Sequence, residues 1–223
     1  MTIQKTPQYI QNLFDTIASK YDFMNNIISL GFQKNIKSKA VKLLDIPPEA
    51  KILDACCGTG DIVSLIKLKF PNSEITGIDF SSQMIEIAKN KNPNINFVLG
   101  DITKTQFPSD NFNTITMAFG FRNIPDKEKT LNELHRILKT NGEFLHLDFG
   151  EKNIFNSIFD KFTPILAEIF CGNSAPYKYL INSKKEFPSP NELIKLFEAF
   201  GFKLKKRRDF VFGAISAQVF VKI

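Results

Sequence analysis

Three aspartates close short apolar runs in the first half of the chain. Asp54, Asp79 and Asp101 each stand at or just past the end of a segment that predicts a β-strand. The carboxyl ends of parallel strands lie at one edge of a sheet, where ligands bind. Asp79 is placed there to accept hydrogen bonds from ribose hydroxyls, and Asp101 from an adenine amino group. Each aspartate alone is more often a helix cap or a turn residue, so the set of three predicts a nucleoside site.

A glycine turn, DACCGTGD, connects the first of these strands to a helical pattern. Gly58 and Gly60 have no side chain, so the backbone can approach a ligand closely. A nicotinamide site expects Gly or Ala three positions after Gly60, where this chain has Val63. Asp54 and Asp61 bracket the turn and would repel a pyrophosphate. A cofactor with a positive centre, such as the sulfonium of S-adenosylmethionine (SAM), is favoured, and a purely structural turn is the alternative.

Composition restricts the class of protein further. The chain has 223 residues, of which 43% are hydrophobic and 23% charged, as expected for one soluble globular domain. No apolar run approaches the ~20 residues of a membrane span, and no secretory signal is recognisable, so we expect a cytoplasmic protein. The three cysteines, two of them adjacent, predict neither a disulfide framework nor a metal site. The net charge of +6 is discounted as evidence for nucleic acid, because the chain is rich in Lys, Asn and Ile together.

Strand and helix patterns alternate over residues 49–150, which is typical of a parallel sheet with helices on both faces. Helical patterns over 7–45, with a second helix at about 34–44, precede this region and suit a lid over a small-molecule site. We therefore expect one α/β domain in three parts. These are a helical cap over 1–48, a cofactor-binding core over 49–150, and substrate-side helices with two closing strands over 151–223.

A broad apolar stripe at helical spacing covers residues 154–170 and is interrupted by Pro164. Core packing is the favoured explanation, and a wall for a lipophilic substrate is the alternative. An aromatic segment at 177–188 leads from the stripe to a further helix at 190–200. A basic cluster at 203–208 is interpreted as a solvated sheet edge, with contact to anionic headgroups as the alternative.

Five segments spread over the chain form a recognisable set. They are Tyr21-Asp22-x-Met24-Asn25, Asp54-x-Cys56-Cys57-Gly58-Thr59, Asp79-Phe80-Ser81, Phe119-Gly120-Phe121-Arg122-Asn123, and Tyr177-x-Tyr179-Leu180-x-x-Ser183 with Phe187-Pro188. With these motifs, nearly the whole chain resembles the ubiquinone/menaquinone biosynthesis C-methyltransferase family. The glycine turn alone is shared by many SAM enzymes, whereas the first and fourth motifs are far more specific.

The resemblance implies a class I SAM-dependent methyltransferase fold, Rossmann-like, with a mostly parallel seven-stranded sheet and helices on both faces. It implies SAM contacts at Thr59, Asp79, Asp101 and Ile102, of which the strand-end argument reaches Asp79 and Asp101 independently. The cofactor-binding residues that we expect are Asp54, Gly58, Thr59, Gly60, Asp79, Phe80, Asp101, Ile102 and Ala118.

The activity that the resemblance implies is methylation of a ring carbon of a prenylated hydroquinone in menaquinone or ubiquinone biosynthesis. A ring hydroxyl must lose its proton so that electron density reaches the neighbouring carbon. Arg122 is the candidate for stabilising or generating the phenolate, and an ion pair with a carboxylate such as Asp126 is its alternative role. Tyr21 and Asp22, on the presumed lid, could contact ring oxygens or act as the base. Asp148 is a weaker candidate base.

Some positions depart from the family pattern. Gln33 and Ile36 stand where the family has His and Trp, and Thr140-Asn141 replaces Pro-Gly in the turn before the fifth strand. The exact quinone is therefore left open. A nucleic-acid methyltransferase is disfavoured, because the segment 118–121 lacks an Asp/Asn-Pro-Pro-aromatic motif. Another small-molecule methyltransferase and a non-catalytic SAM-binding protein stay as alternatives, and peripheral membrane contact and homodimer formation are left open.

Overall fold

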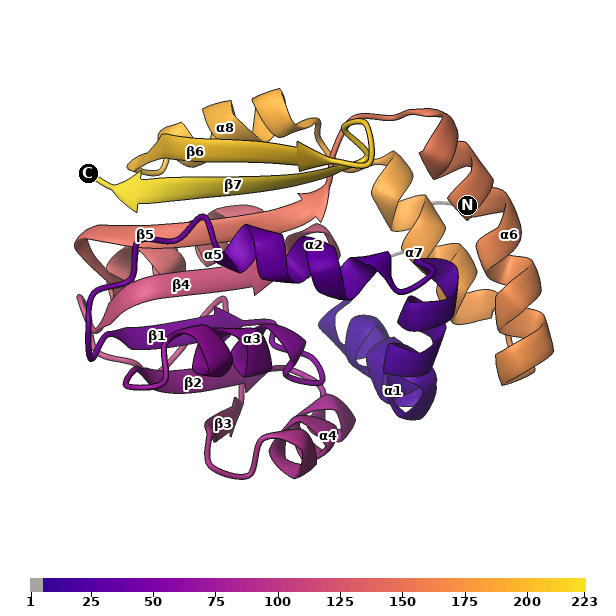
Figure 1. The fold of residues 1–223 in the computed structure, drawn as a ribbon, viewed down its shortest axis with the longest axis horizontal. Coiled ribbons are helices and arrows are strands. Elements are labelled where there is room, and N and C mark those ends of the chain that lie inside the picture. Colours follow the sequence, from indigo (N-terminus) through magenta and orange to yellow (C-terminus); the bar gives the residue numbers. More distant parts are fainter. Residues whose placement is uncertain (1–5) are drawn as a thin grey trace.

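The computed structural model describes residues 6–223, except for the side chains of residues 154 and 155. Its centre is a seven-stranded sheet in the order β3-β2-β1-β4-β5-β7-β6 (Figure 1). Neighbouring strands from β3 to β5 run parallel, and β7 pairs antiparallel with both β5 and β6. The strands are β1 (Lys51–Ala55), β2 (Glu74–Asp79), β3 (Asn96–Leu99), β4 (Phe112–Ala118), β5 (Leu138–Phe149), β6 (Phe202–Phe210) and β7 (Ile215–Lys222).

Helices cover both faces of this sheet. Phe144 of β5 packs against α5 and α8, whereas its neighbour Leu145 packs against α2 on the other face, because successive strand residues point to opposite sides. The predicted α/β class with a mostly parallel seven-stranded sheet is confirmed. The helices are α1 (Pro7–Ile28), α2 (Phe32–Val41), α3 (Asp61–Lys69), α4 (Ser82–Lys91), α5 (Lys127–Ile137), α6 (Ile154–Cys171), α7 (Ala175–Lys185) and α8 (Pro190–Glu198).

Side-chain caps explain where several helices begin. Ser81 accepts a hydrogen bond from the backbone N–H of Met84, which confirms the predicted start of α4. At α8, Ser189 and Glu192 form a reciprocal capping box. The helix following the second strand therefore starts immediately beyond Asp79, and it directs that strand end toward solvent and ligand.

Helix α1 lies at the carboxyl ends of the parallel strands, whereas α2 lies on one face of the sheet (Figure 1). Helix α1 is continuous through Ile28, so the Tyr21–Asn25 motif is helical. Ile10, Leu13 and Ile17 of α1 belong to a core shared with α4, α6 and α7. Helix α1 therefore covers the carboxyl ends of the parallel strands.

Two boundaries differ from the sequence-based expectation. Helix α2 begins at Phe32 and ends at Val41, earlier than the expected 34–44. The aromatic segment beyond the stripe forms helix α7, which the sequence pattern did not predict. Pro176 occupies its first turn, where the missing N–H costs no hydrogen bond, and Tyr177 and Ile181 are buried on one face.

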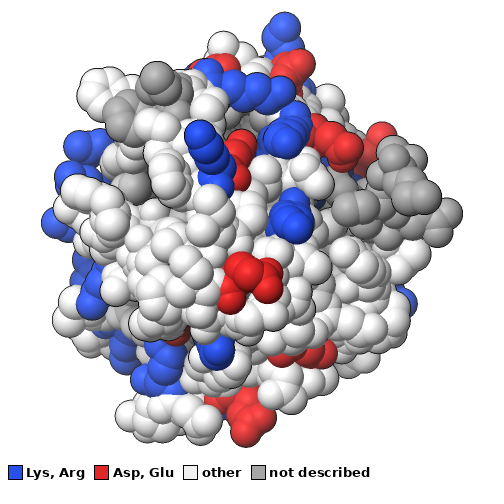
Figure 2. Space-filling view, turned by 90° about the vertical axis from the view of Figure 1, so that its right-hand side faces the viewer, with Lys and Arg blue, Asp and Glu red and all other residues white. Residues whose placement is uncertain are grey.

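Helix α6 corrects the core-packing interpretation of the apolar stripe. Thr163 and Ala167 are buried, but the outward residues are about half exposed or more: Ile158 50%, Phe162 52%, Ile165 51% and Ile169 68%. The helix stands at one end of the molecule (Figure 1) and packs against α1, α7 and the end of β5. Figure 2 shows this side of the molecule, where uncharged surface is interrupted and bordered by both basic and acidic side chains. No helix in residues 6–223 is both long and apolar enough to cross a membrane.

Candidate functional site

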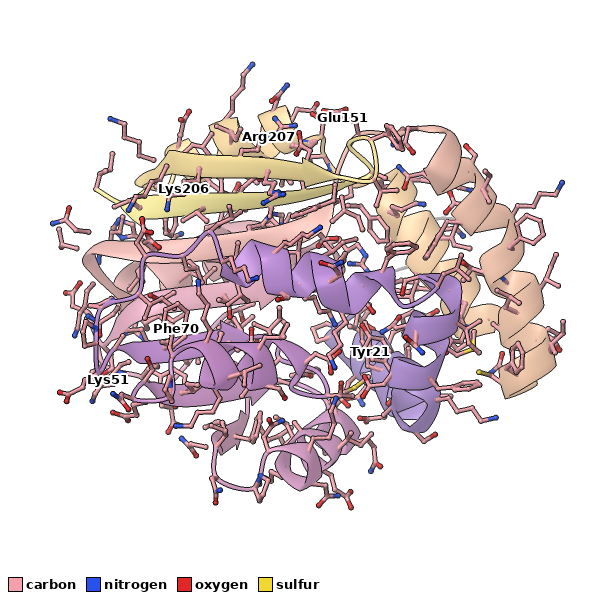
Figure 3. The ribbon with its side chains drawn as sticks, viewed as in Figure 1. Tyr21, Lys51, Phe70, Glu151, Lys206 and Arg207 are labelled. Atoms are coloured by element: carbon pink, nitrogen blue, oxygen red, sulfur yellow. The ribbon has the colours of Figure 1, made fainter. Side chains whose placement is uncertain are left out.

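A cavity of about 540 Å³ lies between α1 and the carboxyl ends of the strands. Tyr21 lies between α1 and these strand ends (Figure 3). The structure thus brings together residues from four strand ends that the sequence proposed for cofactor binding, and roofs them with α1. The lining includes Ile10, Phe14 and Tyr21 from α1, and Cys56, Asp79, Phe80, Asp101, Ile102 and Ala118 from the sheet edge.

The two aspartates in this cavity are fixed by backbone amides. The carboxylate of Asp79 accepts hydrogen bonds from the N–H groups of Gly58 at 2.8 Å and Ser81 at 3.0 Å. Burial raises the pKa of Asp79, while these N–H groups oppose the rise. Asp101 accepts from the N–H of Thr103 at 2.9 Å. A carboxylate has about four lone-pair sites, so both side chains keep capacity for hydroxyl or amino donors.

The glycines of the turn have different roles. Gly58 has φ +52°, and nothing lies within 4 Å of where a Cβ would stand, so this part of the turn is open to a ligand. Gly60 has φ +81°, and a Cβ there would lie 2.9 Å from Asn92 and 3.3 Å from Ala88. Gly60 therefore permits the close packing of the turn on α4.

Asp54 and Asp61 were expected to place two negative charges beside the glycine turn and so to repel a pyrophosphate. This expectation is wrong. Asp54 is buried and accepts a hydrogen bond from Thr116 at 2.6 Å, and burial raises its pKa to about 7. Burial would also raise the pKa of Asp61, but Lys37 at 2.9 Å and Lys91 at 2.6 Å outweigh it and lower that pKa to about 2. Neither carboxylate presents an unbalanced charge to a ligand, because one is buried and the other is paired with two lysines.

Asp22 was expected to contact ring oxygens or act as the base, and Thr59 to contact SAM. In the structure these two side chains hydrogen-bond each other. The Thr59 hydroxyl donates to Asp22 at 2.6 Å, and Lys91 of α4 donates to the other Asp22 oxygen at 2.8 Å. A second tie joins Ser81 to Asp15 at 2.5 Å. Through these hydrogen bonds Asp22 connects α1 to the glycine turn and to α4. The Asp22 side chain therefore stabilises the position of the lid on the core.

A smaller cavity of about 90 Å³ adjoins the first, because Tyr21 and Phe119 line both. Its walls are mostly apolar and come from α1, α2, α6, α7 and the ends of β5 and β7. The lining includes Tyr21, Asn25, Ile28, Ser29, Gln33, Ile36, Phe119, Arg122, Phe149, Phe159, Thr163, Tyr177, Leu180, Ile181 and Ile215.

Arg122 is the charged residue in the wall of this smaller cavity. Its Nη1 donates to Asp148 at 2.9 Å and to the carbonyl of Phe119 at 2.6 Å, and its guanidinium lies 5.0 Å from the Phe149 ring centroid. The predicted ion pair of Arg122 with a carboxylate is therefore confirmed, but the partner is Asp148, and Asp126, the example given, instead caps helix α5. Asp148 is fully buried behind Arg122. Within residues 6–223 the Nε of Arg122 has no hydrogen-bond partner.

Some lining residues were not singled out from the sequence. Ile10 and Phe14 lay on a recognised apolar helix face, but that pattern does not separate core from cavity wall. Cys56 could have been found from its place in the turn. Lys91, which lines neither cavity but bonds Asp22 and Asp61, gave no signal, because the chain has many lysines. Across the described part of the chain, no cluster of three or more His, Cys, Asp or Glu side chains is arranged to hold a metal ion.

Residues 1–222 match the model of the ubiE/COQ5 methyltransferase family. This chain belongs to that family. It is 36% identical to a demethylmenaquinone methyltransferase of Thermotoga maritima over 208 residues, which covers 90% of both chains. It is 37% identical to the ubiquinone/menaquinone biosynthesis C-methyltransferase UbiE of Geotalea daltonii over 217 residues, covering 92% of both.

Solved structures extend the comparison to the fold. A SAM-dependent methyltransferase of Thermotoga maritima, described as a possible histamine N-methyltransferase, superimposes with a TM-score of 0.72 at 19% identity, covering 96% of this chain and 100% of that one. A putative methyltransferase of Haloferax volcanii, in complex with the activator Trm112, gives 0.73 at 16% identity, covering 94% and 97%. These identities show the shared fold, and the ubiE/COQ5 match shows the family.

Proposed function

We propose that this methyltransferase transfers the methyl group of SAM to a ring carbon of a prenylated hydroquinone, converting demethylmenaquinol to menaquinol. The names of its relatives support this substrate. The structural observation that carries the proposal is the junction of two unlike cavities. The larger has carboxylates at strand ends, the smaller is apolar with a buried arginine, and Tyr21 borders both.

The larger cavity fits SAM by its size and donor set. Asp79 and Asp101 have carboxylate capacity for the ribose hydroxyls and the adenine amino group, and Ile102 and Ala118 offer apolar contact to the base. The open space at Gly58 leaves room for the methionine part of the cofactor. When bound, SAM supplies an electrophilic methyl group on a sulfonium.

The smaller cavity would hold the acceptor ring. Arg122 stabilises the phenolate that forms when a ring hydroxyl loses its proton, because its guanidinium is held in place by Asp148 and the residue lines the smaller cavity. The ring carbon beside that oxygen uses an electron pair to form the new carbon–carbon bond as the methyl–sulfur bond breaks. Loss of the proton on that carbon to solvent restores the aromatic ring. Tyr21, which borders both cavities, is the candidate to hydrogen-bond the reacting oxygen, whose proton also passes to solvent.

Asp148 has a supporting role in this arrangement. It is buried behind Arg122 and lines neither cavity, so it acts on the acceptor through the guanidinium. The surrounding phenylalanines exclude water from the ion pair, which strengthens it. Alignment of the two reactants by the cavity walls contributes as well, by about 7–11 kcal/mol in favourable cases.

Methyl transfer from labelled SAM tests the proposal directly. The acceptors are a demethylmenaquinol analogue, a ubiquinone-pathway benzoquinol, histamine and RNA. Methylation of the naphthoquinol at carbon, faster than of the other three, is the expected result. Faster methylation of the benzoquinol would move the enzyme to the ubiquinone pathway, and transfer only to histamine or RNA would overturn the quinol assignment.

We also propose that the protein works in the cytoplasm at the inner face of the membrane, with α6 against the lipid. The outward face of α6 is apolar, and Phe159 and Thr163 on its other side line the acceptor cavity. Two exposed lysines lie at this helix, Lys161 on α6 itself and Lys20 of α1 at the carbonyl of Phe170, and they complement anionic headgroups despite the exposed Glu168. The basic cluster on β6 is less suited, because Lys205 and Lys206 are paired with Asp45 and Glu143. A homodimer through α6 is the rival arrangement.

A further inference from the structure

Four polar residues spaced four apart line the smaller cavity: Tyr21, Asn25, Ser29 and Gln33. The first two lie on α1, Ser29 caps its end, and Gln33 lies on α2. Residues four apart share a helix face. The turn between the helices continues this face, since the N–H of Gln33 bonds the Ser29 hydroxyl at 3.3 Å. The four residues form a polar row, which we call the 21–33 row.

Three members of the 21–33 row have unused hydrogen-bonding groups. In the part of the chain that the structure describes, the Tyr21 hydroxyl and the amides of Asn25 and Gln33 make no side-chain hydrogen bond. All three are partly buried beside apolar walls. None of these polar groups is fully buried, so each can exchange a bound water for a hydrogen-bonding ligand in the cavity. The row is therefore suited to a ligand that brings its own oxygen atoms into an apolar pocket.

The remaining walls limit where those oxygens can lie. Phe119, Phe149 and Ile215 are apolar, and Arg122 is the charged group among the other lining residues. A hydroquinone acceptor has two ring oxygens, para to each other. If the reacting oxygen lies at Arg122, the second oxygen needs a hydrogen-bonding partner elsewhere in the cavity. The 21–33 row comes from different elements than Arg122 and supplies that partner.

We propose that Asn25 and Gln33 are positioning residues that hydrogen-bond the second ring oxygen of the acceptor and so select two-oxygen rings over simple phenols. This inference rests on the proposed function, because it assumes that the acceptor is a hydroquinone in the smaller cavity. An amide both donates and accepts, so either residue can bind a hydroxyl. The reacting oxygen stays with Arg122.

The test compares two acceptors and four proteins. The acceptors are the naphthohydroquinone and the monohydroxy analogue that keeps the reacting hydroxyl but lacks the para oxygen. The proteins are wild type, Asn25→Leu, Gln33→Leu and the control Asn26→Leu. The control changes an exposed neighbour that lines neither cavity. SAM affinity, measured by calorimetry, shows whether each variant keeps the cofactor site.

The wild type should prefer the hydroquinone in kcat/KM. Asn25→Leu and Gln33→Leu should each raise KM for the hydroquinone about tenfold, equivalent to about 1.4 kcal/mol, and leave KM for the monohydroxy analogue and the SAM affinity unchanged. Asn26→Leu should match the wild type on both acceptors. Equal effects on both acceptors, or none on either, would overturn the inference while leaving the quinol activity intact. No methylation of either acceptor by the wild type would instead overturn the proposed function, and this inference with it.

Discussion

The guanidinium of Arg122 is positioned by the protein from two directions. A carbonyl and a carboxylate each bond its Nη1, and aromatic rings lie beside its plane. Both Arg122 and Asp148 are almost inaccessible to water, so their attraction is little screened. An acceptor phenolate would meet a cation whose orientation is already set, which is the condition under which such a charge lowers a barrier effectively.

Replacing this cation should separate chemistry from cofactor binding. We expect Arg122→Lys to slow turnover about tenfold and Arg122→Ala well over tenfold, with nearly unchanged SAM affinity, because Arg122 lines only the smaller cavity. Lysine keeps the charge but loses the planar donor set. Single-turnover rates and SAM calorimetry measure the two effects. Arg208→Ala, at an exposed arginine, is the control, and wild-type turnover in Arg122→Lys and Arg122→Ala would remove Arg122 from the mechanism.

At the scale of elements, the contacts of α1 make it a lid fastened at separate points. Asp22 joins it to the glycine turn and to α4, and Gln11 donates to the carbonyl of Phe80 at 3.2 Å. The same helix supplies apolar wall to the larger cavity. Removing one of these contacts should therefore raise the dissociation rate of a bound cofactor.

Lys91→Met tests the lid. It removes the ion pairs of Lys91 with Asp22 and Asp61 while keeping an unbranched side chain. We expect SAM to dissociate several times faster, and amide hydrogens in α1 to exchange faster, with little change in melting temperature. The same substitution at exposed Lys89 on α4 is the matched control. Equal dissociation rates in the two variants would show that the Lys91 contacts do not hold the lid.

The outward face of α6 gives a second prediction at this scale. Ile165→Glu places a charge on an exposed apolar site, where it costs little stability but opposes lipid insertion. We expect binding to vesicles containing anionic lipid to fall at least tenfold, with turnover on a short-chain soluble acceptor unchanged. Vesicle sedimentation and light scattering make the comparison, with Leu68→Glu, at an exposed leucine of α3, as the control. If the wild type is a dimer that Ile165→Glu converts to a monomer, α6 is a subunit interface instead.

For the whole molecule, the pH dependence of stability should carry a contribution from His146. The ring is buried among Phe121, Phe144, Phe187 and Phe197. Burial lowers its pKa from 6.5 to about 4, although Asp148 opposes the shift. Between these values the unfolded chain binds more protons than the folded one, so this contribution is full above about pH 6.5 and is lost as pH falls to about 4.

The His146 contribution should be on the order of 3 kcal/mol. Asp54 acts with the opposite sign, because its raised pKa favours the folded state at low pH. The informative quantity is therefore the difference in unfolding free energy between wild type and His146→Leu. We expect that difference to change between pH 6.5 and 4 in favour of the variant, as measured by urea denaturation. A constant difference would show that His146 keeps its ordinary pKa.

Much of this fold could be predicted because its signals are local. Alternating apolar periods predict the strands and helices in order, and parallel connections bring the ends that carry Asp79 and Asp101 to one edge. The pairing of Arg122 with Asp148 could not be predicted, since it depends on β4 and β5 being neighbours and on one rotamer. The exposure of α6 was missed for a related reason: periodicity shows that a face is apolar and not what covers it. Asp54 does not line the cavity, because it lies within β1 and its buried carboxyl group bonds Thr116 of β4, a neighbour that the sequence does not reveal.

Helix α1 borders both cavities, and Tyr21 is part of each wall. If the position of this shared wall depends on what either cavity holds, binding of the two ligands is linked, and each changes the affinity for the other by the same factor. Saturating acceptor would then change the measured Kd of the cofactor, and saturating cofactor would change that of the acceptor by the same ratio. A spent cofactor, lacking the methyl group that presses toward the acceptor, would weaken that hold, and the methylated product would be released as part of the same cycle.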